Sequence, residues 1–520
     1  MRRIDLRIIK DFYHKVPVWV WYGLAALTPF FATTFRLFFV DVENVDLFHS
    51  FPTWNDEGLW WHQIGAMAEY GQPLGYFGYN GTHAQIGRFG PWGFAILLPY
   101  AAFAKIFGWN YNSMALANML FLCLANALFM LLTRMEKKNI KWFVICACTS
   151  YITIYYANTS MSEPLRFSMG IILAGMLYRL YRFGGGKVYK YIVVPAVLLY
   201  CISAYLPFVL FIPYYVFGIR KESSLRFRII VSFFATVTAA WIFNGISTLF
   251  AAPYTESAVK DILAAVQENP MQGIIMFVNR FFESLLEVDL TGILKFVSEG
   301  SLIGYFDLTY YMLMILLAVD LAVKVRKNEK MECVCKHTCI FCLFLLASFI
   351  FIFAGFYSTY LWTWVRGLNV AFCAVTCLLV LCGNKRIIVA LTCFTILIFP
   401  RIWVTYDLTR YPTNAGLDRY YTTREELSEC IDLAVSGDAD PWENTCGIYG
   451  YSYDPYFVMC LPAGIGINFV LDETVCPYIK YAVVCGIESN SATVERLQGA
   501  GYDILWTDGK NALYVMRESI

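Results

Sequence analysis

Two adjacent carboxylates at the start of an aromatic-rich stretch are the residues best suited to chemistry. Asp56 and Glu57 follow Trp54 and Asn55, and an amphipathic stretch over residues 59–70 comes after them. A carboxylate partly removed from water is a stronger base and is held in place, so either residue could take a proton from a hydroxyl group. The same residues could instead start a helix, since Asn55 or Asp56 is a good N-cap and first-turn acids complement the helix dipole.

A segment rich in glycine and aromatic residues follows over residues 75–93. So many glycines indicate tight turns that let the backbone approach a ligand. Arg88 in this segment could hold a phosphate through paired hydrogen bonds, or it could anchor the chain at lipid headgroups. Tyr79 and His83, together with Trp54, could shape a substrate site, although a histidine at a surface or interface needs no such role.

The composition indicates the environment in which these residues act. Of the 520 residues, 58% are hydrophobic and only 15% are charged, and the mean hydropathy is +0.53. These values exclude a soluble multidomain enzyme, a disordered chain and a coiled coil. Forty Lys and Arg against 39 Asp and Glu leave a formal charge of +1, which excludes a nucleic-acid binder because there is no basic excess to neutralise phosphates. The sequence therefore predicts an all-α, multi-pass protein of the cell membrane.

Nine apolar runs are long enough to cross about 30 Å of hydrocarbon. They lie near residues 16–40, 113–133, 142–157, 165–183, 229–250, 302–322, 338–356, 367–382 and 387–403. The first run is too long for a signal-peptide core, so we expect it to remain as the first span.

Lys and Arg in short loops favour the cytoplasmic side and so set the orientation. The basic N-terminus is predicted to be cytoplasmic, with the first outer loop over residues 41–112. The next basic loop, 134–141, is cytoplasmic only if residues 91–108 do not cross, so we expect these to form an interfacial helix. Residues 191–218 have basic residues at both ends and are predicted to turn back as two short spans. The total is about eleven transmembrane helices, with the C-terminus outside.

The chain changes character after residue 403. Residues 1–403 form the predicted transmembrane domain, and 404–520 are more polar. Strand-like runs are expected at 446–449, 481–485, 504–506 and 512–516, with helices at 424–434 and 492–498. This tail is predicted to be a small extracytoplasmic α/β domain.

The order of features in the first outer loop resembles a known family, the type C glycosyltransferases. Asp-Glu comes first, then the Gly/Tyr-rich stretch, then Pro-Trp-Gly-Phe-Ala-Ile-Leu-Leu-Pro-Tyr over residues 91–100. These integral membrane enzymes take a sugar from a polyprenyl phosphate carrier, and they include the protein mannosyltransferases, the aminoarabinose transferase of lipid A and the oligosaccharyltransferase catalytic subunit. The resemblance implies a helical bundle with juxtamembrane helices in the first loop.

Two departures bear on the acceptor. The double proline common in this loop is replaced by Gly90-Pro91-Trp92, and no Trp-Trp-Asp-type acceptor-peptide motif occurs. A cell-envelope lipid or polysaccharide is therefore expected as acceptor in preference to a protein.

The resemblance also implies roles for single residues. The family's catalytic carboxylate falls on Asp56, with Glu57 beside it, and a second acidic residue of the next outer loop falls on Glu163. Arg366, together with Arg88, would hold the donor phosphate. A divalent cation, Mg²⁺ or Mn²⁺, bound by Asp56 and Glu163 is implied by part of the family. The plain alternatives are a helix start at Glu163, with Ser162 and Pro164 around it, and a snorkelling side chain at Arg366.

The expected activity is that of an inverting glycosyltransferase. A sugar would move from the polyprenyl phosphate to an extracytoplasmic lipid or glycan acceptor in a single displacement, with Asp56 as base. The alternative is a lipid or polysaccharide transporter or flippase without transferase activity. Charges buried in spans are expected along a transporter path. Asp307 and Asp320, near the ends of one predicted helix, are the nearest cases.

Overall fold

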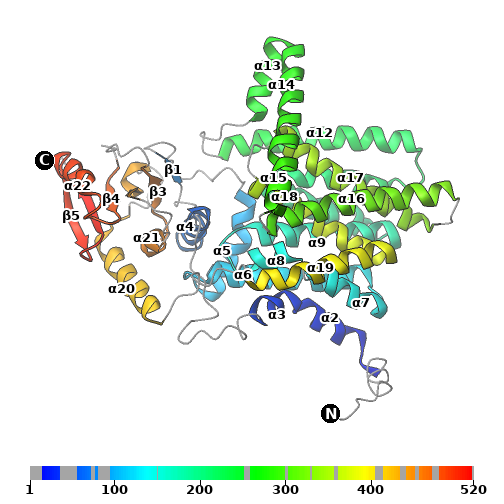
Figure 1. Cartoon of the computed structure of the whole chain (residues 1–520), viewed down its shortest axis with the longest axis horizontal. Coiled ribbons are helices and arrows are strands. Elements are labelled where there is room, and N and C mark those ends of the chain that lie inside the picture. Colours follow the sequence, from blue (N-terminus) through cyan, green and yellow to red (C-terminus); the bar gives the residue numbers. More distant parts are fainter. Residues whose placement is uncertain are drawn as a thin grey trace.

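The computed structural model describes most of the chain. The described residues are 15–35, 55–71, 77–79, 94–148, 150–250, 258–298, 302–327, 331–356, 361–404, 414–433, 441–450, 456–470 and 479–517. Helices dominate the first four hundred residues and a small sheet forms the tail (Figure 1).

The bundle is built from long apolar helices. Its members are α2 (Val18–Ala26), α3 (Thr28–Phe35), α6 (Ser113–Thr133), α7 (Lys137–Phe143), α8 (Tyr151–Ala157), α9 (Glu163–Phe183), α10 (Val194–Ala204), α11 (Ile212–Ile219), α12 (Leu225–Phe250), α16 (Leu302–Arg326), α17 (Cys333–Phe356), α18 (Leu361–Leu381) and α19 (Lys385–Val404). Among the described residues, four helices (α6, α12, α16 and α17) are long and apolar enough to cross a membrane. A fifth span results if α7 and α8, which are bent by 70°, count as one. The chain is thus a multi-pass membrane protein, and these helices do not by themselves establish a total of eleven spans.

Each predicted apolar run contains helix over most of its described residues. The two ambiguous stretches are helical too, and both are short. Residues 91–108 contain α5 (Leu97–Phe107), whose 11 residues make a helix of about 16 Å, too short to cross. The 191–218 stretch is divided at Tyr205, which has extended backbone between α10 and a 3₁₀ turn (Leu206–Phe211).

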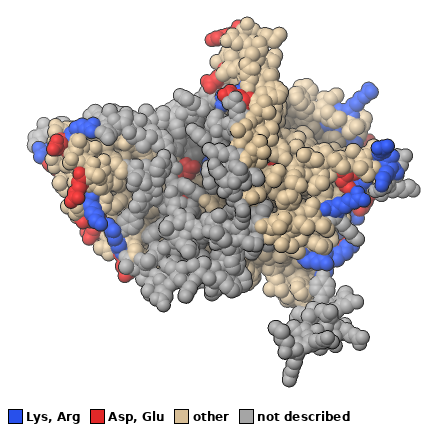
Figure 2. Space-filling view, in the orientation of Figure 1, with Lys and Arg blue, Asp and Glu red and all other residues tan. Residues whose placement is uncertain are grey.

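The distribution of charged residues over the surface agrees with a membrane-spanning bundle. In Figure 2, Lys and Arg gather at the end of the bundle remote from the tail and on the tail itself, and few appear on the described bundle surface next to that end. The lipid-facing candidates on α12 are apolar and exposed, among them Phe233, Phe234 and Trp241, as expected of a helix that spans a bilayer.

Five of the described helices belong to the predicted outer loops and not to the bundle. α4 (Asn55–Tyr70) and α5 belong to the predicted first outer loop, and α13 (Ala258–Glu268), α14 (Pro270–Glu283) and α15 (Thr291–Ser298) belong to the second. A π-helical segment, Ser284–Leu290, joins α14 to α15.

The tail is an α/β unit whose sheet takes a strand from the first outer loop. The strands are β1 (Phe77–Tyr79), β2 (Thr445–Tyr449), β3 (Gly466–Phe469), β4 (Tyr481–Val484), β5 (Tyr502–Thr507) and β6 (Ala512–Met516), and the helices are α20 (Asn414–Cys430), α21 (Tyr456–Cys460) and α22 (Ser491–Gly499). The sheet order is β1-β3-β2-β4-β6-β5. β1, β3, β2 and β4 run parallel, and β6 and β5 are antiparallel to their neighbours.

The four strands and two helices predicted in the tail are present, whereas β1 and β3 were not expected. β1 has only three residues within a glycine-rich segment, and its partner β3 lies almost four hundred residues later. Period-based prediction finds neither, because each is shorter than the window in which alternation becomes visible.

Candidate active site

Three of the predicted residues meet at one point. Arg366 Nη1 lies 3.3 Å from Asp56 Oδ2 and 3.6 Å from Glu163 Oε1. Asp56 is the second residue of α4, Glu163 is the first residue of α9, and Arg366 lies in the second turn of α18. The cluster therefore joins residues that are up to 310 positions apart in the sequence.

Close helix crossings bring α18 to this point. Gly367 follows Arg366, and a Cβ atom there would come within 1.7 Å of the Phe353 ring on α17. Gly170 of α9 lies against Val370 of α18, where a Cβ atom would be 3.2 Å from the carbonyl oxygen. Glycines at both crossings let three helices approach closely, and the guanidinium of Arg366 reaches the first turn of α9 as a result.

Asp56 is held in a partly dry setting. Its side chain retains 29% exposure. Burial raises the pKa of Asp56 above its ordinary 3.8, the positive charge of Arg366 opposes this, and the negative charge of Glu163 adds to it. The net direction is upward, which makes Asp56 a stronger base than an exposed aspartate.

Glu57 is more deeply buried than Asp56 and contacts a different part of the chain. It is only 1% exposed, and its Oε1 accepts a hydrogen bond of 2.8 Å from the backbone N–H of Ser160. Asn118 of α6 holds the same loop, since its Nδ2 donates to the carbonyls of Thr159 and Met161, each at 2.8 Å. Glu57 thus ties the first turn of α4 to the loop that starts α9.

Arg166 is a second cation at the site, and the sequence did not single it out. Its Nη1 lies 3.8 Å from Glu163 Oε1, and its guanidinium lies 4.8 Å from the Tyr205 ring and 6.0 Å from the Trp60 ring. The signal that could have found it is the spacing, because Glu163 and Arg166 are three apart on one helix and so share a face.

The donor set does not fit a divalent cation. Arg366 Nη1 lies between Asp56 and Glu163, where a bridging metal would have to sit. In the described part of the chain, no three His, Cys, Asp or Glu side chains are arranged to hold a metal ion. Mg²⁺ and Mn²⁺ need several oxygen ligands, whereas here two guanidinium groups, those of Arg366 and Arg166, already pair with the two carboxylates.

Other predicted residues lie outside the described residues. These are Trp54, His83 and Arg88. Tyr79 is the last residue of β1, and its backbone is paired with Phe469 of β3. The first outer loop therefore contributes both a site residue, Asp56, and a strand of the tail.

The helix α4 that carries Asp56 lies between two hydrophobic cores. Trp60 and Ile64 pack into the core of the bundle, whereas Leu59 and Trp61 pack into the core of the tail. Tail residues come so close that a Cβ atom at Gly65 would be 2.7 Å from Ala463 Cβ. The tail thus helps to fix the helix that holds the candidate base.

His62 is part of this second contact. Its Nε2–H donates to the carbonyl of Val458. Burial is the main cause that lowers the pKa of His62 to about 4, so the ring is neutral at pH 7. His62 therefore attaches α4 to the tail.

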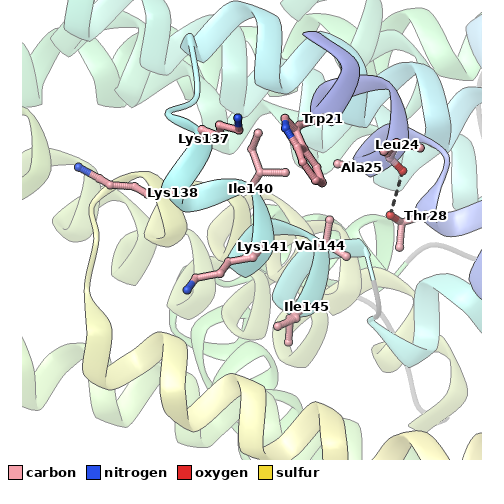
Figure 3. A pocket seen from close by; sticks show the side chains of 10 residues that line it. All are labelled: Trp21, Leu24, Ala25, Thr28, Lys137, Lys138, Ile140, Lys141, Val144 and Ile145. Atoms are coloured by element: carbon pink, nitrogen blue, oxygen red, sulfur yellow. Dashed lines mark hydrogen bonds between the residues drawn. The ribbon is translucent and has the colours of Figure 1, made fainter. Parts of the chain in front are cut away.

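A separate cavity of about 680 Å³ opens between α2 and α7 (Figure 3). Its walls are mostly apolar, and three lysines, Lys137, Lys138 and Lys141, contribute to its lining. Lys137 points toward Trp21, with its Nζ 5.6 Å from the centre of the indole ring. None of the predicted site residues that the structure describes lines this cavity.

Comparison with known proteins gives structural matches alone. No protein-family model and no curated protein sequence matches the chain. The structure is similar to ArnT from Cupriavidus metallidurans bound to undecaprenyl phosphate, at 11% identity over 96% of this chain and 98% of that one, with a TM-score of 0.39. It is also similar to the oligosaccharyltransferase AglB from Archaeoglobus fulgidus, which was solved with an inhibitory peptide and a dolichol-phosphate. That match has 11% identity over 96% of this chain and 74% of that one, with a TM-score of 0.48. At this level of similarity the activity has to be inferred from the residues of this chain.

Proposed function

We propose that the protein is a membrane glycosyltransferase that moves a sugar from a polyprenyl phosphate carrier to a hydroxyl group of a cell-envelope lipid or polysaccharide. The observation that carries the proposal is the Asp56–Arg366–Glu163 cluster, in which a carboxylate with a raised pKa lies 3.3 Å from a guanidinium beside the membrane helices. The motif order of the first outer loop gives independent support.

Asp56 acts as the general base. The acceptor hydroxyl gives its proton to Asp56 as its oxygen attacks the anomeric carbon of the sugar. The bond between that carbon and the carrier phosphate breaks, and the phosphate leaves with the electron pair. A single displacement inverts the configuration at the anomeric carbon. A base whose pKa is raised by burial matches this role better than an exposed aspartate.

Arg366 stabilises the leaving phosphate. Among the described residues, both of its carboxylate contacts use Nη1, so Nε and Nη2 can donate to a phosphate. Such donors are most effective where charge develops in a water-poor site. Because Arg366 already supplies positive charge between Asp56 and Glu163, the reaction is proposed to proceed without a resident metal.

The assignment of the base rests on a contrast between neighbours. Glu57 is buried and accepts a backbone hydrogen bond, so taking up a proton would compete with that bond. Asp56 keeps part of its side chain exposed and lies beside the cation. Asp56 is therefore the base and Glu57 a positioning residue.

The direct test uses the full-length protein in proteoliposomes with a labelled polyprenyl phosphate sugar. Asp56→Asn is expected to lower turnover by about 10²–10⁴-fold, the usual contribution of a general base. Glu57→Gln keeps a carbonyl acceptor for Ser160 N–H and is expected to retain most of the activity. Chelation of divalent cations should leave the wild-type rate unchanged.

Several results would count against the proposal. Full turnover in Asp56→Asn would remove the base assignment, and a chelator-sensitive rate would remove the metal-free reaction. Movement of the labelled lipid across the bilayer without transfer of its sugar would favour the transporter alternative. In the structure, Asp320 Oδ2 accepts hydrogen bonds of 2.6 Å from Lys324 Nζ and from Asn384 Nδ2. This charged residue of a candidate span is therefore paired within the protein.

A further inference from the structure

The α13–α14 hairpin carries an apolar face that the rest of the described protein does not cover. Met271, Ile275, Val278 and Phe282 recur at intervals of four, three and four residues, which places them along one side of α14. With Ile274 they are between 41% and 65% exposed. An apolar stripe of this kind on a soluble loop would be unfavourable, so its surroundings must be apolar.

A polar side of α14 adjoins the apolar face. Gln272, Asn279 and Glu283 lie there, seven and four residues apart, and all three are exposed. The hairpin as a whole has no basic excess, since Lys260 and Arg280 are outnumbered by Asp261, Glu268 and Glu283. Attraction to anionic headgroups therefore does not drive the binding of this hairpin to a membrane. Insertion of its apolar side chains does.

The contacts of α14 fix its depth in the membrane. Phe277 packs against Phe351 and Phe356 at 5.5 and 5.2 Å between ring centres, and Phe281 packs against Phe351 at 5.6 Å. Phe356 is the last residue of the candidate span α17. The hairpin is thus attached at the level where a membrane helix ends, which is the interface between hydrocarbon and headgroups.

The orientation of the hairpin relative to the membrane helices agrees with a position in the interface. In Figure 1, α13 and α14 project from the bundle crosswise to α16 and α17, as a structure lying in the membrane plane would. Phe351 is itself 47% exposed on α17, so the apolar face of α14 continues the lipid-facing surface of that span. Gly273 permits the close α13–α14 contact, since a Cβ atom there would lie 2.7 Å from the backbone nitrogen of Val266.

We propose that the α13–α14 hairpin lies in the outer lipid–water interface, with Met271, Ile274, Ile275, Val278 and Phe282 inserted among the acyl chains. Its partner is the bilayer itself and not a second copy of the chain or an acceptor polymer. The segment Ser284–Leu290 that follows α14 packs against α17 and α18, so the inserted hairpin is linked to the helix that carries Arg366.

The test is photo-crosslinking of the full-length protein in proteoliposomes of phosphatidylethanolamine and phosphatidylglycerol. The photoreactive residue p-benzoylphenylalanine is placed at Ile274 or at Val278, and Gln272 and Glu283, which lie farthest round the helix from these two positions, serve as matched controls. All four positions are exposed on the same helix, so each variant should fold, and size-exclusion chromatography checks this.

Lipid adducts detected by mass spectrometry should be several-fold more abundant from positions 274 and 278 than from 272 and 283, and added salt should not change the ratio. Equal yields on the two sides would overturn the proposal. So would a cross-link from position 274 or 278 to a second copy of the chain. Neither measurement depends on transferase activity, so the outcome is separate from that of the proposed function.

Discussion

At the level of single residues, Asp56 experiences two opposing influences. Burial disfavours its charged form, and Arg366 favours it. Burial prevails, so the proton is lost at a higher pH than from an exposed aspartate. A base works only when it is ionised, and activity should therefore fall on acidification through a pKa above 3.8.

Removing the positive charge of Arg366 should raise the pKa of Asp56 further. Arg366→Gln takes away the positive charge that lowers the pKa of Asp56, so the acid limb of kcat/KM is expected to shift to higher pH. Turnover should also fall, because the leaving phosphate loses a donor. The measurement is the pH profile of the variant beside that of Arg366→Lys, which keeps the charge. An acid limb that stays at the wild-type position in Arg366→Gln would contradict the coupling.

The same residue sets a pH dependence of stability. A group whose pKa is raised in the folded state stabilises that state at low pH, and this contribution is lost as the pH rises through the folded pKa. Asp56→Asn, which is neutral at every pH, should therefore raise the melting temperature at pH 7 more than at pH 4. Thermal unfolding in nanodiscs measures this. An equal shift at both pH values would show that burial does not dominate the pKa of Asp56.

Sequence reasoning reached part of this cluster. Asp56, Glu163 and Arg366 were named because the order of motifs resembles a family, and the structure places them together. The function of Glu57 could not be read from the sequence, because it depends on a contact with Ser160, 103 residues away. Arg166 was missed for the same reason, since its aromatic neighbours Trp60 and Tyr205 come from other parts of the chain.

At the level of elements, the short loop between α8 and α9 determines where Glu163 lies. Asn118 is central to it, because its amide donates to two loop carbonyls and its Oδ1 accepts a 2.5 Å hydrogen bond from the Tyr100 hydroxyl. A single side chain on α6 therefore connects α5, the loop and the start of α9.

Asn118→Leu should destabilise the protein by about 1–3 kcal/mol, the cost of leaving a buried polar group without a partner, and should lower turnover. Asn126→Leu is the matched control on the same helix. Asn126 is equally buried, but its Oδ1 has no hydrogen-bond partner in the described structure. Thermal unfolding and turnover are compared for the two variants. Equal losses in both would show that helix packing, and not the loop contacts, is responsible.

The helices were the most predictable elements. Long apolar runs have few alternatives to helix in a bilayer, because every backbone polar group must be paired within the segment. The amphipathic hairpin in the second outer loop and the strand β1 were not predicted. Their positions follow from contacts with α17 and β3, which no local pattern encodes.

At the level of the whole molecule, the tail and the bundle hold α4 between them. Removal of the tail is therefore expected to disturb the position of Asp56, even though none of the tail's described residues belongs to the Asp56 cluster. Gly65 is a closely packed point of this contact, because a Cβ atom would meet both Ala463 and Trp109 at 2.7 Å.

Gly65→Ala should weaken the docking of the tail and lower turnover, although alanine is the better helix former. Gly23→Ala is the control, since Gly23 lies within α2 and a Cβ atom there would have nothing within 4 Å. That variant should be as stable as the wild type or slightly more so. Turnover and melting temperature in proteoliposomes are the readouts. If Gly65→Ala behaves like Gly23→Ala, the tail does not position α4 through this contact.

The pairing of β1 with β3 has a consequence for biosynthesis. β1 is made early, but the strand beside it follows only after a further ~390 residues, which at roughly 5–20 residues per second means a delay on the order of 20–80 s. During that interval the ribosome is still producing membrane helices, and β1 of the first outer loop has not yet gained β3 as its pairing strand. The β1–β3 pair can therefore form only when translation is nearly complete, so truncated chains that leave the ribosome early should insert into the membrane yet lack this part of the sheet.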